Sequence, residues 1–512
     1  MTDWIGYRWL AETYDVRPVQ AFRIDSQIAR SRTTVREDGY VHEHYVPAAR
    51  PAASIAGHLT FALRHEGIHL EFLYRLFAKI GPSAMEAWVT NEPTGQYARR
   101  ACFLFEWLLG QQLDFPGVTA GNYVNALDDT AYLTAARPIN NPRWRVRDNM
   151  PGAADFCPLI SRTAKVQEAE QYDCAHSLRA LEHDFGTDLL MRSAVWLTIK
   201  ESRASFAIER EEKHQDRIHR FADVMERRCG AYDSPLLEAT VTELQAEILG
   251  KRATRYGLRK SPVFVGESHD YTTIVHYVAP HWDDAPTLLQ GLRNFDARTK
   301  GRPSLLRAAA ISFGFVYIHP MADGNGRISR FLVNDVLRRD GAVPAPFILP
   351  ISVTITSNAI SRHGYDQILE VFSKPLMSHY RDDYGFGRRN TGEDGVEFDF
   401  EFNAYTDALP AWRYPDLTAH AEYLHDVVRA TIEHEMREEA VQLRAIRAAR
   451  EQVKNLLEGP DNDIDRIVRS IRQNGGALSG KLKKEFPMLE DETLAAEIAT
   501  AVSRAFSGDE TQ

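Results

Sequence analysis

The chain has 512 residues, of which 44% are hydrophobic and 26% are charged, and it carries a formal net charge of -10. This length exceeds one ordinary domain and predicts about three or four modules. The hydrophobic content allows a sizeable core under a solvated surface. The acidic balance opposes a phosphate backbone, so general nucleic-acid binding through a basic surface is not expected.

Cysteine usage and the lack of a targeting pattern favour the cytoplasm. The four cysteines are far apart and form no C-x-x-C pair, so we expect reduced thiols and neither a disulfide framework nor a zinc site. The N-terminal stretch "MTDWIGYRWL" lacks the basic-then-apolar pattern of a signal peptide. No apolar run approaches the roughly 20 residues of a membrane helix, so no membrane partner is expected.

The first third of the chain predicts a mainly helical module. Residues 33–47 alternate around a central Asp-Gly and predict a hairpin. Residues 54–80 place apolar side chains at helical spacing up to a "GPS" stop, which predicts one helix with a buried face. Pro, Asn, Gly and Asp concentrate over residues 140–158, so we expect a module edge near 150.

The middle of the chain predicts further helices around one hairpin. Helical periodicity returns over residues 184–228 and 234–249. Residues 263–278 alternate β-branched and aromatic side chains around a polar turn, which predicts two strands. Residues 285–298 and 303–318 resume helix, and the second stretch has no charge after its one arginine, so we expect it at the centre of a core.

The C-terminal part predicts one long helix and a small helical module. Apolar residues from Leu424 to Leu457 form a stripe on one face of a predicted long charged helix, which ends at Gly459-Pro460. The last fifty residues predict two or three short helices, with a winged-helix-like arrangement over 460–512 as one interpretation. Basic residues here could touch nucleic acid, but a solvated face is the expected reading.

Two short patterns tempt a different function. His65 to His69, "HEGIH", fits the zinc-protease pattern H-E-x-x-H, yet Gly67 weakens the helix and no compelling third ligand is found, although Glu86 or Glu92 could be proposed. "GGALSGKL" from Gly475 satisfies G-x-x-x-x-G-K, but a leucine replaces the magnesium-binding Ser/Thr and a helix, not a strand, is expected before it. We expect neither a zinc protease nor a P-loop.

The stretch "YIHPMADGNGRISRFL" (317–332) predicts a phosphate-binding loop. Gly324, Asn325 and Gly326 form a tight loop that feeds the N-terminus of a helix, where unpaired amides and the dipole favour an anion. The glycines allow close backbone approach, and Asn325 tolerates left-handed geometry while offering its side-chain amide.

Charged residues on both sides of this loop complete a reaction site. Arg327 and Arg330 lie three residues apart and can fork onto phosphate oxygens. Asp323 would repel phosphate unless it held a divalent cation that bridges to those oxygens. His319 has the only side chain here whose unperturbed pKa suits proton abstraction near neutral pH. Together these groups predict transfer of a phosphorus-centred group to a hydroxyl.

The run from His319 to Arg330 resembles the signature of the Fic family (filamentation induced by cyclic AMP), H-P-F-x-[D/E]-G-N-[G/K]-R-x-x-R. One position departs, because Met321 replaces Phe, and methionine can fill the same apolar pocket. The resemblance implies a Fic helical core with a β-hairpin flap, and AMP transfer from ATP to a Ser, Thr or Tyr hydroxyl of a protein. Gly326 stands where the phosphorylating, Doc-like members carry Lys, which favours the AMP-transferring kind.

The resemblance also implies a role for each motif residue. His319 would take the hydroxyl proton, and Asp323 would hold Mg²⁺ at the α- and β-phosphates of ATP. The hairpin at 263–278 would be the flap that pairs with an extended target segment. Phosphate contacts are implied for Gly324, Asn325, Gly326, Arg327 and Arg330.

"SFAIER" (205–210) resembles the inhibitory helix of the family, [S/T]-x-x-x-E-[G/N]. Ser205 and Glu209 match this pattern, whereas Arg210 replaces Gly or Asn. The resemblance implies that Glu209 pairs with Arg330 in the place of the γ-phosphate, so ATP binds unproductively until the helix shifts.

We therefore predict a mainly α-helical protein with a Fic core and an autoinhibited protein adenylyltransferase activity that uses ATP and Mg²⁺. Two alternatives stay open: removal of AMP from modified proteins at the same site, and a nucleotide-sensing regulator whose C-terminal module binds DNA or a partner. The expected partner is a target protein on the flap, and a homodimer stays open. The predicted parts are an N-terminal module (1–150), a region with the inhibitory helix (151–230), the Fic core (231–385) and a C-terminal helical module (386–512).

Overall fold

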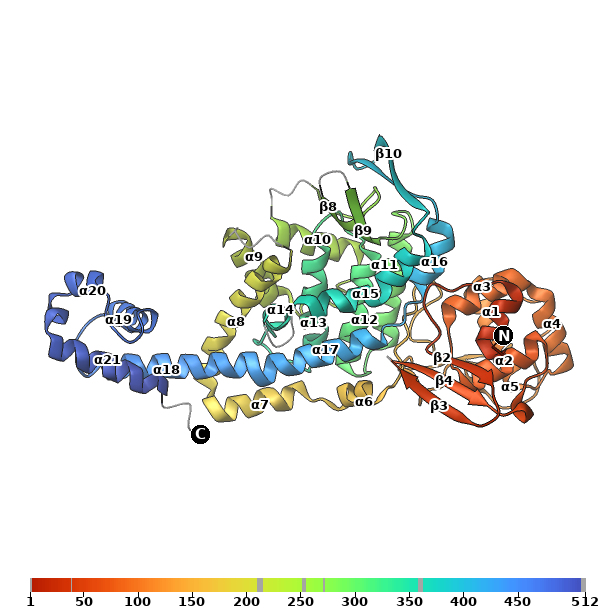
Figure 1. The fold of residues 1–512 in the computed structure, drawn as a ribbon, viewed down its shortest axis with the longest axis horizontal. Coiled ribbons are helices and arrows are strands. Elements are labelled where there is room, and N and C mark those ends of the chain that lie inside the picture. Colours follow the sequence, from red (N-terminus) through yellow and green to blue (C-terminus); the bar gives the residue numbers. More distant parts are fainter. Residues whose placement is uncertain are drawn as a thin grey trace. The chain divides into compact units, whose positions relative to one another are not determined.

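Helices dominate the chain, and the prediction of a mainly α-helical protein is confirmed (Figure 1). The computed structural model describes residues 2–37, 39–209, 215–250, 255–269, 272–357 and 362–507. Arg210, the departure in the predicted inhibitory helix, and Asp270, in the turn of the predicted flap, lie outside these ranges. Within the described residues, no helix has the length and hydropathy to cross a membrane.

The chain forms two compact units, each built from three separate segments. The first, which we call the core unit, comprises residues 1–172, 213–342 and 360–426. The second, which we call the α8 unit, comprises residues 173–212, 343–359 and 427–512. The predicted domain boundaries near 150, 230 and 385 stay predictions.

The N-terminal part of the core unit combines helices with two small sheets. Its helices are α1 (Gly6–Tyr14), α2 (Ile55–His65), α3 (Leu70–Ile80), α4 (Pro82–Asn91), α5 (Gln96–Leu109) and the short turn η1 (Pro47–Ala49). One sheet has the order β1-β2-β4-β3 and the other β5-β7-β6. The strands are β1 (Trp4–Ile5), β2 (Ile24–Ile28), β3 (Thr33–Glu37), β4 (Tyr40–Tyr45), β5 (Val124–Asn125), β6 (Ile139–Asn141) and β7 (Val146–Asp148).

The predicted hairpin at 33–47 is present as β3 and β4, but the predicted single helix over 54–80 is wrong. The chain leaves helical geometry between His65 and Leu70, and Gly67 takes a φ of +83° there. A Cβ at Gly67 would come within 2.2 Å of the Tyr132 hydroxyl, so the turn requires glycine.

The motif-bearing part of the core unit is a helical layer centred on α12 (Ser304–Ile318). Thirteen of its fifteen residues are buried, as the uncharged sequence predicts. Helix α13 (Asn325–Arg339) packs against α12, and both are adjacent in Figure 1. The other helices here are α6 (Ala164–Gln171), α9 (Gln215–Arg228), α10 (Glu238–Leu249), α11 (Ala285–Arg298), α15 (Arg362–His379), α16 (Tyr405–Arg413) and α17 (Thr418–Ala430).

Two hairpins lie together on the core unit. The predicted hairpin at 263–278 is present as β8 (Phe264–His269) and β9 (Thr272–Val278). The second, β10 (Tyr384–Thr391) with β11 (Glu397–Phe402), lies where we predicted only helix. Its sequence signal is the alternation of Glu/Asp and Phe in "EFDFEF". The Phe264 ring packs on those of Phe386 and Phe400, so β10–β11 braces the first hairpin.

The α8 unit contains helices and loops, and no strand among its described residues. Its elements are α7 (Cys174–Phe185), α8 (Thr187–Ile208), α14 (Ile351–Thr356), η2 (Thr431–Met436), α18 (Arg437–Lys454), α19 (Asp461–Gln473), α20 (Gly480–Glu485), η3 (Pro487–Glu490) and α21 (Glu492–Ser507). The predicted long C-terminal helix is divided into α17, a π-helical turn η2 and α18. A winged helix takes its wing from a β-hairpin, and no strand occurs between residues 461 and 507, so that interpretation lacks its wing.

Candidate active site

His319 ends helix α12 in a left-handed conformation, with φ 49° and ψ 52°. Its amide donates to the carbonyl of Phe315 at 2.9 Å. Its Nδ1 lies 3.3 Å from the carbonyl oxygen of Val316 and must donate to it, since a carbonyl only accepts. The proton of the neutral imidazole therefore belongs on Nδ1, which leaves the lone pair on Nε2.

Burial, together with the positive charge of Arg259, lowers the pKa of His319 to about 4. The imidazole is consequently neutral at pH 7, the state that a general base requires. A side chain with a left-handed backbone, a fixed tautomer and a strongly lowered pKa is a candidate for function on physical grounds.

The loop after His319 is closed by Asn325 and anchored by Met321. The Asn325 amide group donates to the Met321 carbonyl at 2.8 Å, and its oxygen accepts from the Met321 amide at 2.9 Å. The Met321 side chain is fully buried, as expected of the apolar anchor under the loop. Both polar atoms of the Asn325 side chain are thus used within the loop. The side-chain NH2 of Asn325 carries a second N–H donor, so the predicted contact of Asn325 with phosphate stays a prediction.

Gly324 and Asp323 form the turn that starts α13. Gly324 takes a φ of +81°, the left-handed conformation that favours glycine. The Asp323 carboxylate accepts from the Gly324 amide at 2.6 Å and from Arg327 at 3.4 Å, while its side chain stays 57% exposed. A single exposed carboxylate beside a helix N-terminus suits a cation that also binds phosphate and water.

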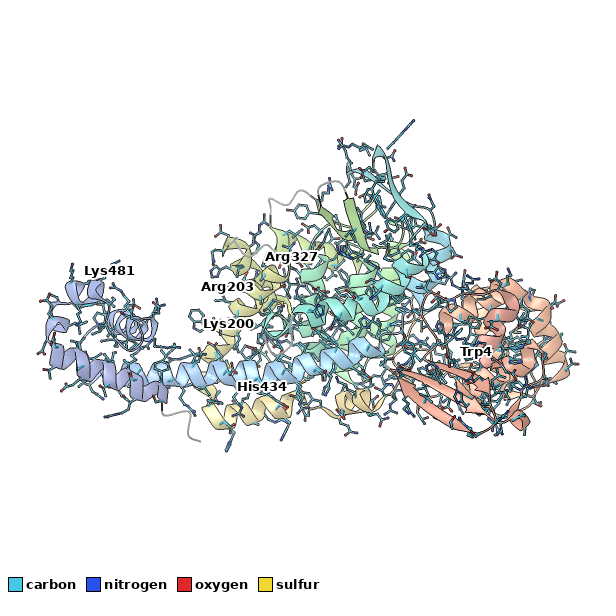
Figure 2. The ribbon with its side chains drawn as sticks, in the orientation of Figure 1. Trp4, Lys200, Arg203, Arg327, His434 and Lys481 are labelled. Atoms are coloured by element: carbon cyan, nitrogen blue, oxygen red, sulfur yellow. The ribbon has the colours of Figure 1, made fainter. Side chains whose placement is uncertain are left out.

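Arg327 and Arg330 lie on the first turns of α13, and Figure 2 labels Arg327 in the core unit. Each is only 3% exposed. Gly326 precedes them in the same turn, where backbone amides have no acceptor within their own helix. His319, Asp323, the glycine loop and both arginines thus lie on the end of α12, the following loop and the first turns of α13, and their predicted roles stay predictions.

Two residues that the sequence analysis missed hold this segment in place. Gln245 on α10 is fully buried; it donates to the Asp323 carbonyl at 2.9 Å and accepts from the Gly257 amide at 2.7 Å. Arg259 donates to the His319 carbonyl at 2.7 Å. Both residues lie more than fifty positions from their partners in the motif, and no local pattern marks them.

Ser205 and Glu209 belong to the other compact unit. Ser205 is buried on α8, and Glu209 follows the last residue of that helix. The predicted pairing of Glu209 with Arg330 stays a prediction, because it joins two separately described units.

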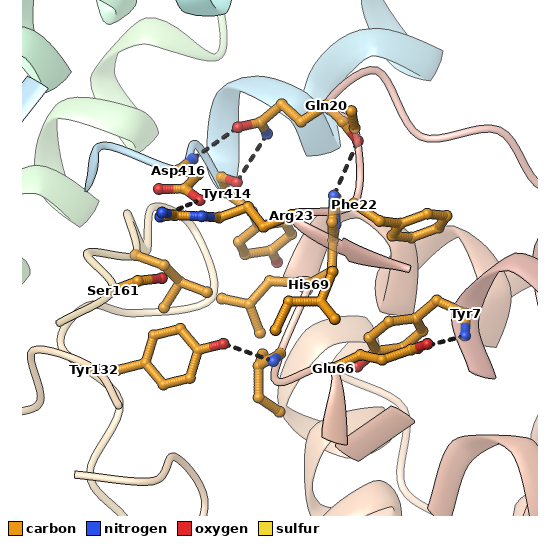
Figure 3. Close-up of a pocket in the computed structure, with 15 residues that line it drawn as sticks. Tyr7, Gln20, Phe22, Arg23, Glu66, His69, Tyr132, Ser161, Tyr414 and Asp416 are labelled. Atoms are coloured by element: carbon orange, nitrogen blue, oxygen red, sulfur yellow. Dashed lines mark hydrogen bonds and ion pairs between the residues drawn. The ribbon is translucent and has the colours of Figure 1, made fainter. Parts of the chain in front are cut away.

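The HEGIH segment does not form a metal site, and its rejection as a zinc protease stands. His65 ends α2, whereas His69 caps α3, so the two imidazoles do not share a helix face. Figure 3 shows the bond between His69 and the Gln20 carbonyl, and the other His69 nitrogen accepts from the Phe72 amide. In the described ranges, no group of three or more His, Cys, Asp or Glu could hold a metal ion.

The phosphate-binding reading of the C-terminal "GGALSGKL" also fails, as predicted. Helix α19 precedes it, where a P-loop would follow a strand. Ser479 instead caps the short helix α20 by accepting from the Leu482 amide.

Comparison with known proteins singles out the segment around the motif. Residues 235–337 match the model of the Fic/DOC family. A Fic family protein from Desulfovibrio desulfuricans G20 is 18% identical, with a TM-score of 0.37 over 66% of this chain and 90% of its own. A Fic domain containing signaling protein from Bacteroides thetaiotaomicron VPI-5482 is 19% identical, with a TM-score of 0.33 over 54% of this chain and 98% of its own. The segment that carries His319 and its loop is therefore similar to the Fic/DOC family.

Proposed function

We propose that this chain transfers AMP from ATP to a hydroxyl group of a target protein. The observation that carries the proposal is the state of His319, whose tautomer is set by the Val316 carbonyl and which ends α12 a few residues before the glycine loop at the N-terminus of α13. The match of residues 235–337 to the Fic/DOC family supports the same chemistry.

In the proposed reaction, Nε2 of His319 accepts the proton of the target hydroxyl. The hydroxyl oxygen then forms a bond to the α-phosphorus of ATP, while the bond between that phosphorus and the oxygen leading to the β-phosphate breaks. Pyrophosphate leaves and AMP stays on the target. Because the pKa of His319 is lowered to about 4, its imidazole is unprotonated at Nε2 over the whole neutral pH range.

The other motif residues would bind the phosphates. Arg327 and Arg330, both buried, would fork onto phosphate oxygens, and the amides at the start of α13 would bind further oxygens. Asp323 would hold Mg²⁺, which neutralises charge on the phosphates when bound. The exposure of the Asp323 carboxylate suits this role.

We further propose that Glu209 inhibits the enzyme by binding Arg330 in place of the γ-phosphate. Ser205 and Glu209 match the inhibitory pattern of the family, and Ser205 is fully buried on α8. In its own unit α8 is anchored firmly, because the buried Glu201 carboxylate accepts from the amide and the hydroxyl of Ser352 at 2.7 and 2.5 Å. Relief of inhibition would then need movement of a helix that is fixed at its middle.

The test is AMP transfer by the purified full-length protein with ATP labelled at the α-phosphate and Mg²⁺, followed by intact mass. We expect Glu209→Gly to label itself or an added protein extract, and His319→Ala in the same background to lose labelling. ATP labelled at the γ-phosphate distinguishes AMP transfer from phosphorylation.

Two other outcomes would redirect the proposal. Release of AMP from a modified protein without incorporation would make the chain a deAMPylase. Retention of DNA without any nucleotide transfer would support the regulator alternative. Absence of ATP binding by calorimetry in Glu209→Gly would contradict the proposed function.

A further inference from the structure

Arg259 is a buried cation whose recorded acceptors, among the described residues, are all backbone carbonyls. Its side chain is 1% exposed. Its Nη2 donates to Pro280 at 2.5 Å and to Ile318 at 3.5 Å, its Nη1 to Ser261 at 3.3 Å, and its Nε to His319 at 2.7 Å. Burial lowers the pKa of Arg259 to about 10, so the guanidinium stays charged at pH 7. A buried charge is costly, and its retention at one site calls for a reason.

The four carbonyls come from two places that the proposed reaction must keep together. Ser261 and Pro280 flank the β8–β9 hairpin on its two sides. Ile318 and His319 are the last residue of α12 and its cap, where helix carbonyls otherwise lack partners. The guanidinium fork thus joins the base of the flap to the end of the helix that bears His319.

Arg259 also stabilises the unusual backbone of His319. A left-handed conformation costs a non-glycine residue roughly 1–2 kcal/mol, so surrounding bonds must hold it. The Arg259 side chain binds the His319 carbonyl, and the Arg259 amide donates to the Pro320 carbonyl at 3.0 Å. The carbonyl of His319 and that of the next residue are therefore both bound by Arg259.

The charge of Arg259 acts on the imidazole as well. After burial, it is the largest cause of the lowered pKa of His319, and the bond to Val316 opposes it. The motif itself carries three further charged side chains, Asp323, Arg327 and Arg330. Beside Arg259, the Asp394 carboxylate accepts from the Ser261 hydroxyl, and the buried Tyr277 of β9 donates its hydroxyl to the Tyr317 carbonyl.

We propose that Arg259 is a positioning residue for the catalytic base. It fixes the backbone of His319 and bonds it to both ends of the flap, so that a target docked on the flap is held in a fixed position relative to the base. This inference rests on the proposed function. In this role Arg259 acts through the backbone of the base and of the flap, to which all four of its guanidinium bonds go.

Arg302 offers a matched control in the same unit. Its guanidinium also binds backbone carbonyls, those of Thr134 and Ala135 at 2.9 and 2.7 Å, and the Thr134 hydroxyl at 3.1 Å, and among the described residues its hydrogen bonds do not reach the flap or α12. Replacing either arginine by lysine keeps the charge and removes the fork. A purely structural role would make the two substitutions equivalent.

The experiment compares Arg259→Lys, Arg259→Gln and Arg302→Lys in the full chain with the Glu209→Gly substitution. Histidine NMR titration, with the His319 signal assigned by its loss in His319→Gln, gives the pKa of the imidazole without any turnover. AMP-transfer kinetics give kcat, and KM for ATP.

We expect Arg259→Gln to raise the pKa of His319 toward its ordinary value and to shift the acid limb of the pH–rate profile upward. Arg259→Lys should keep that pKa low but lower kcat by roughly 10- to 100-fold with KM for ATP within about twofold, because the base is misplaced. Arg302→Lys should change neither quantity.

An unchanged pKa in a folded Arg259→Gln, or an unchanged kcat in Arg259→Lys, would overturn the proposal. If Arg259→Gln does not fold, the kcat of Arg259→Lys decides. If no variant transfers AMP, the proposed function fails, and the NMR titration still reports whether Arg259 controls the imidazole.

Discussion

Two turns of this molecule carry histidines within motif-like sequences, and they differ in whether a ring nitrogen is left without a hydrogen bond. At 65–69, both nitrogens of His69 are bonded within the protein, to Gln20 and Phe72. At 319–325, His319 bonds through Nδ1 alone, and no partner for Nε2 occurs among the described residues. The His69 imidazole caps α3 and bonds that cap to the loop that contains Gln20, whereas His319 keeps one ring nitrogen without a hydrogen bond among the described residues.

The pKa alone does not separate these classes of histidine. Burial lowers the pKa of His58 to about 4 and that of His420 to about 3, values close to that of His319. Yet His58 accepts from the Gly6 amide and stacks on Trp9, and His420 binds the Tyr317 hydroxyl. Nδ1 of His420 also lacks a hydrogen-bond partner among the described residues, so an open ring nitrogen does not mark a base either, and what distinguishes His319 is its place at the start of the glycine loop.

The largest expected effect is the loss of AMP transfer on substitution in the turn at 319–325. His319→Ala should lower AMP transfer by roughly 10²- to 10⁴-fold, the usual contribution of a general base, without loss of ATP binding. His69→Ala should lower the melting temperature and leave kcat within about threefold, since its bonds are structural. Labelled-AMP assays and thermal unfolding check both. A loss of activity in His69→Ala equal to that in His319→Ala would break the comparison.

The second expected effect concerns two asparagines that make the same contact. Asn325 clamps the backbone of Met321, and the buried Asn149 clamps that of Leu127 through bonds of 2.8 and 2.9 Å. Each Asn→Ala leaves a buried donor and acceptor unpaired, at a cost of about 2 to 4 kcal/mol.

Only Asn325→Ala should also weaken ATP binding by calorimetry, because we propose phosphate binding for its loop and not for the loop that holds Asn149. If Asn149→Ala weakened ATP binding as much, the effect would report general destabilisation rather than loop geometry.

Much of the turn at 319–325 could be predicted from the sequence because the residues that form it are close together in the chain. Glycines at 324 and 326, the arginines three apart and the helix ends all follow from spacing within one short run. Arg259 and Gln245 were missed because their role depends on which distant carbonyls the fold brings to them. The break after His65 was missed as well, because the clash that requires glycine at 67 comes from Tyr132, more than sixty residues away.

The third expected effect is on the acid stability of the chain. The unfolded chain binds protons on His58 and His420 near pH 6.5, whereas the folded chain binds them only near 4 and 3. Their contribution to stability is therefore complete above pH 6.5 and is lost as the pH falls from 6.5 toward 4. Each contributes up to about 1.4 kcal/mol per pH unit in that window.

His58→Gln and His420→Gln should each flatten the pH dependence of urea unfolding below pH 6.5, with little change in kcat at pH 7. Equal slopes in both variants and the parent would show that burial does not hold these imidazoles neutral.

The smallest expected effect is at Met321, where the loop departs from the family signature. Its side chain is fully buried beneath the loop, so Met321→Phe exchanges one large apolar group for another and should cost less than about 1.5 kcal/mol, with kcat within about threefold. Met321→Ser removes most of that packing and should cost roughly 2 to 5 kcal/mol and weaken ATP binding. Thermal unfolding and calorimetry measure both. Damage by Phe as great as that by Ser would mean that the pocket is shaped for methionine, and that the loop obtains its geometry from packing rather than from the Asn325 bonds.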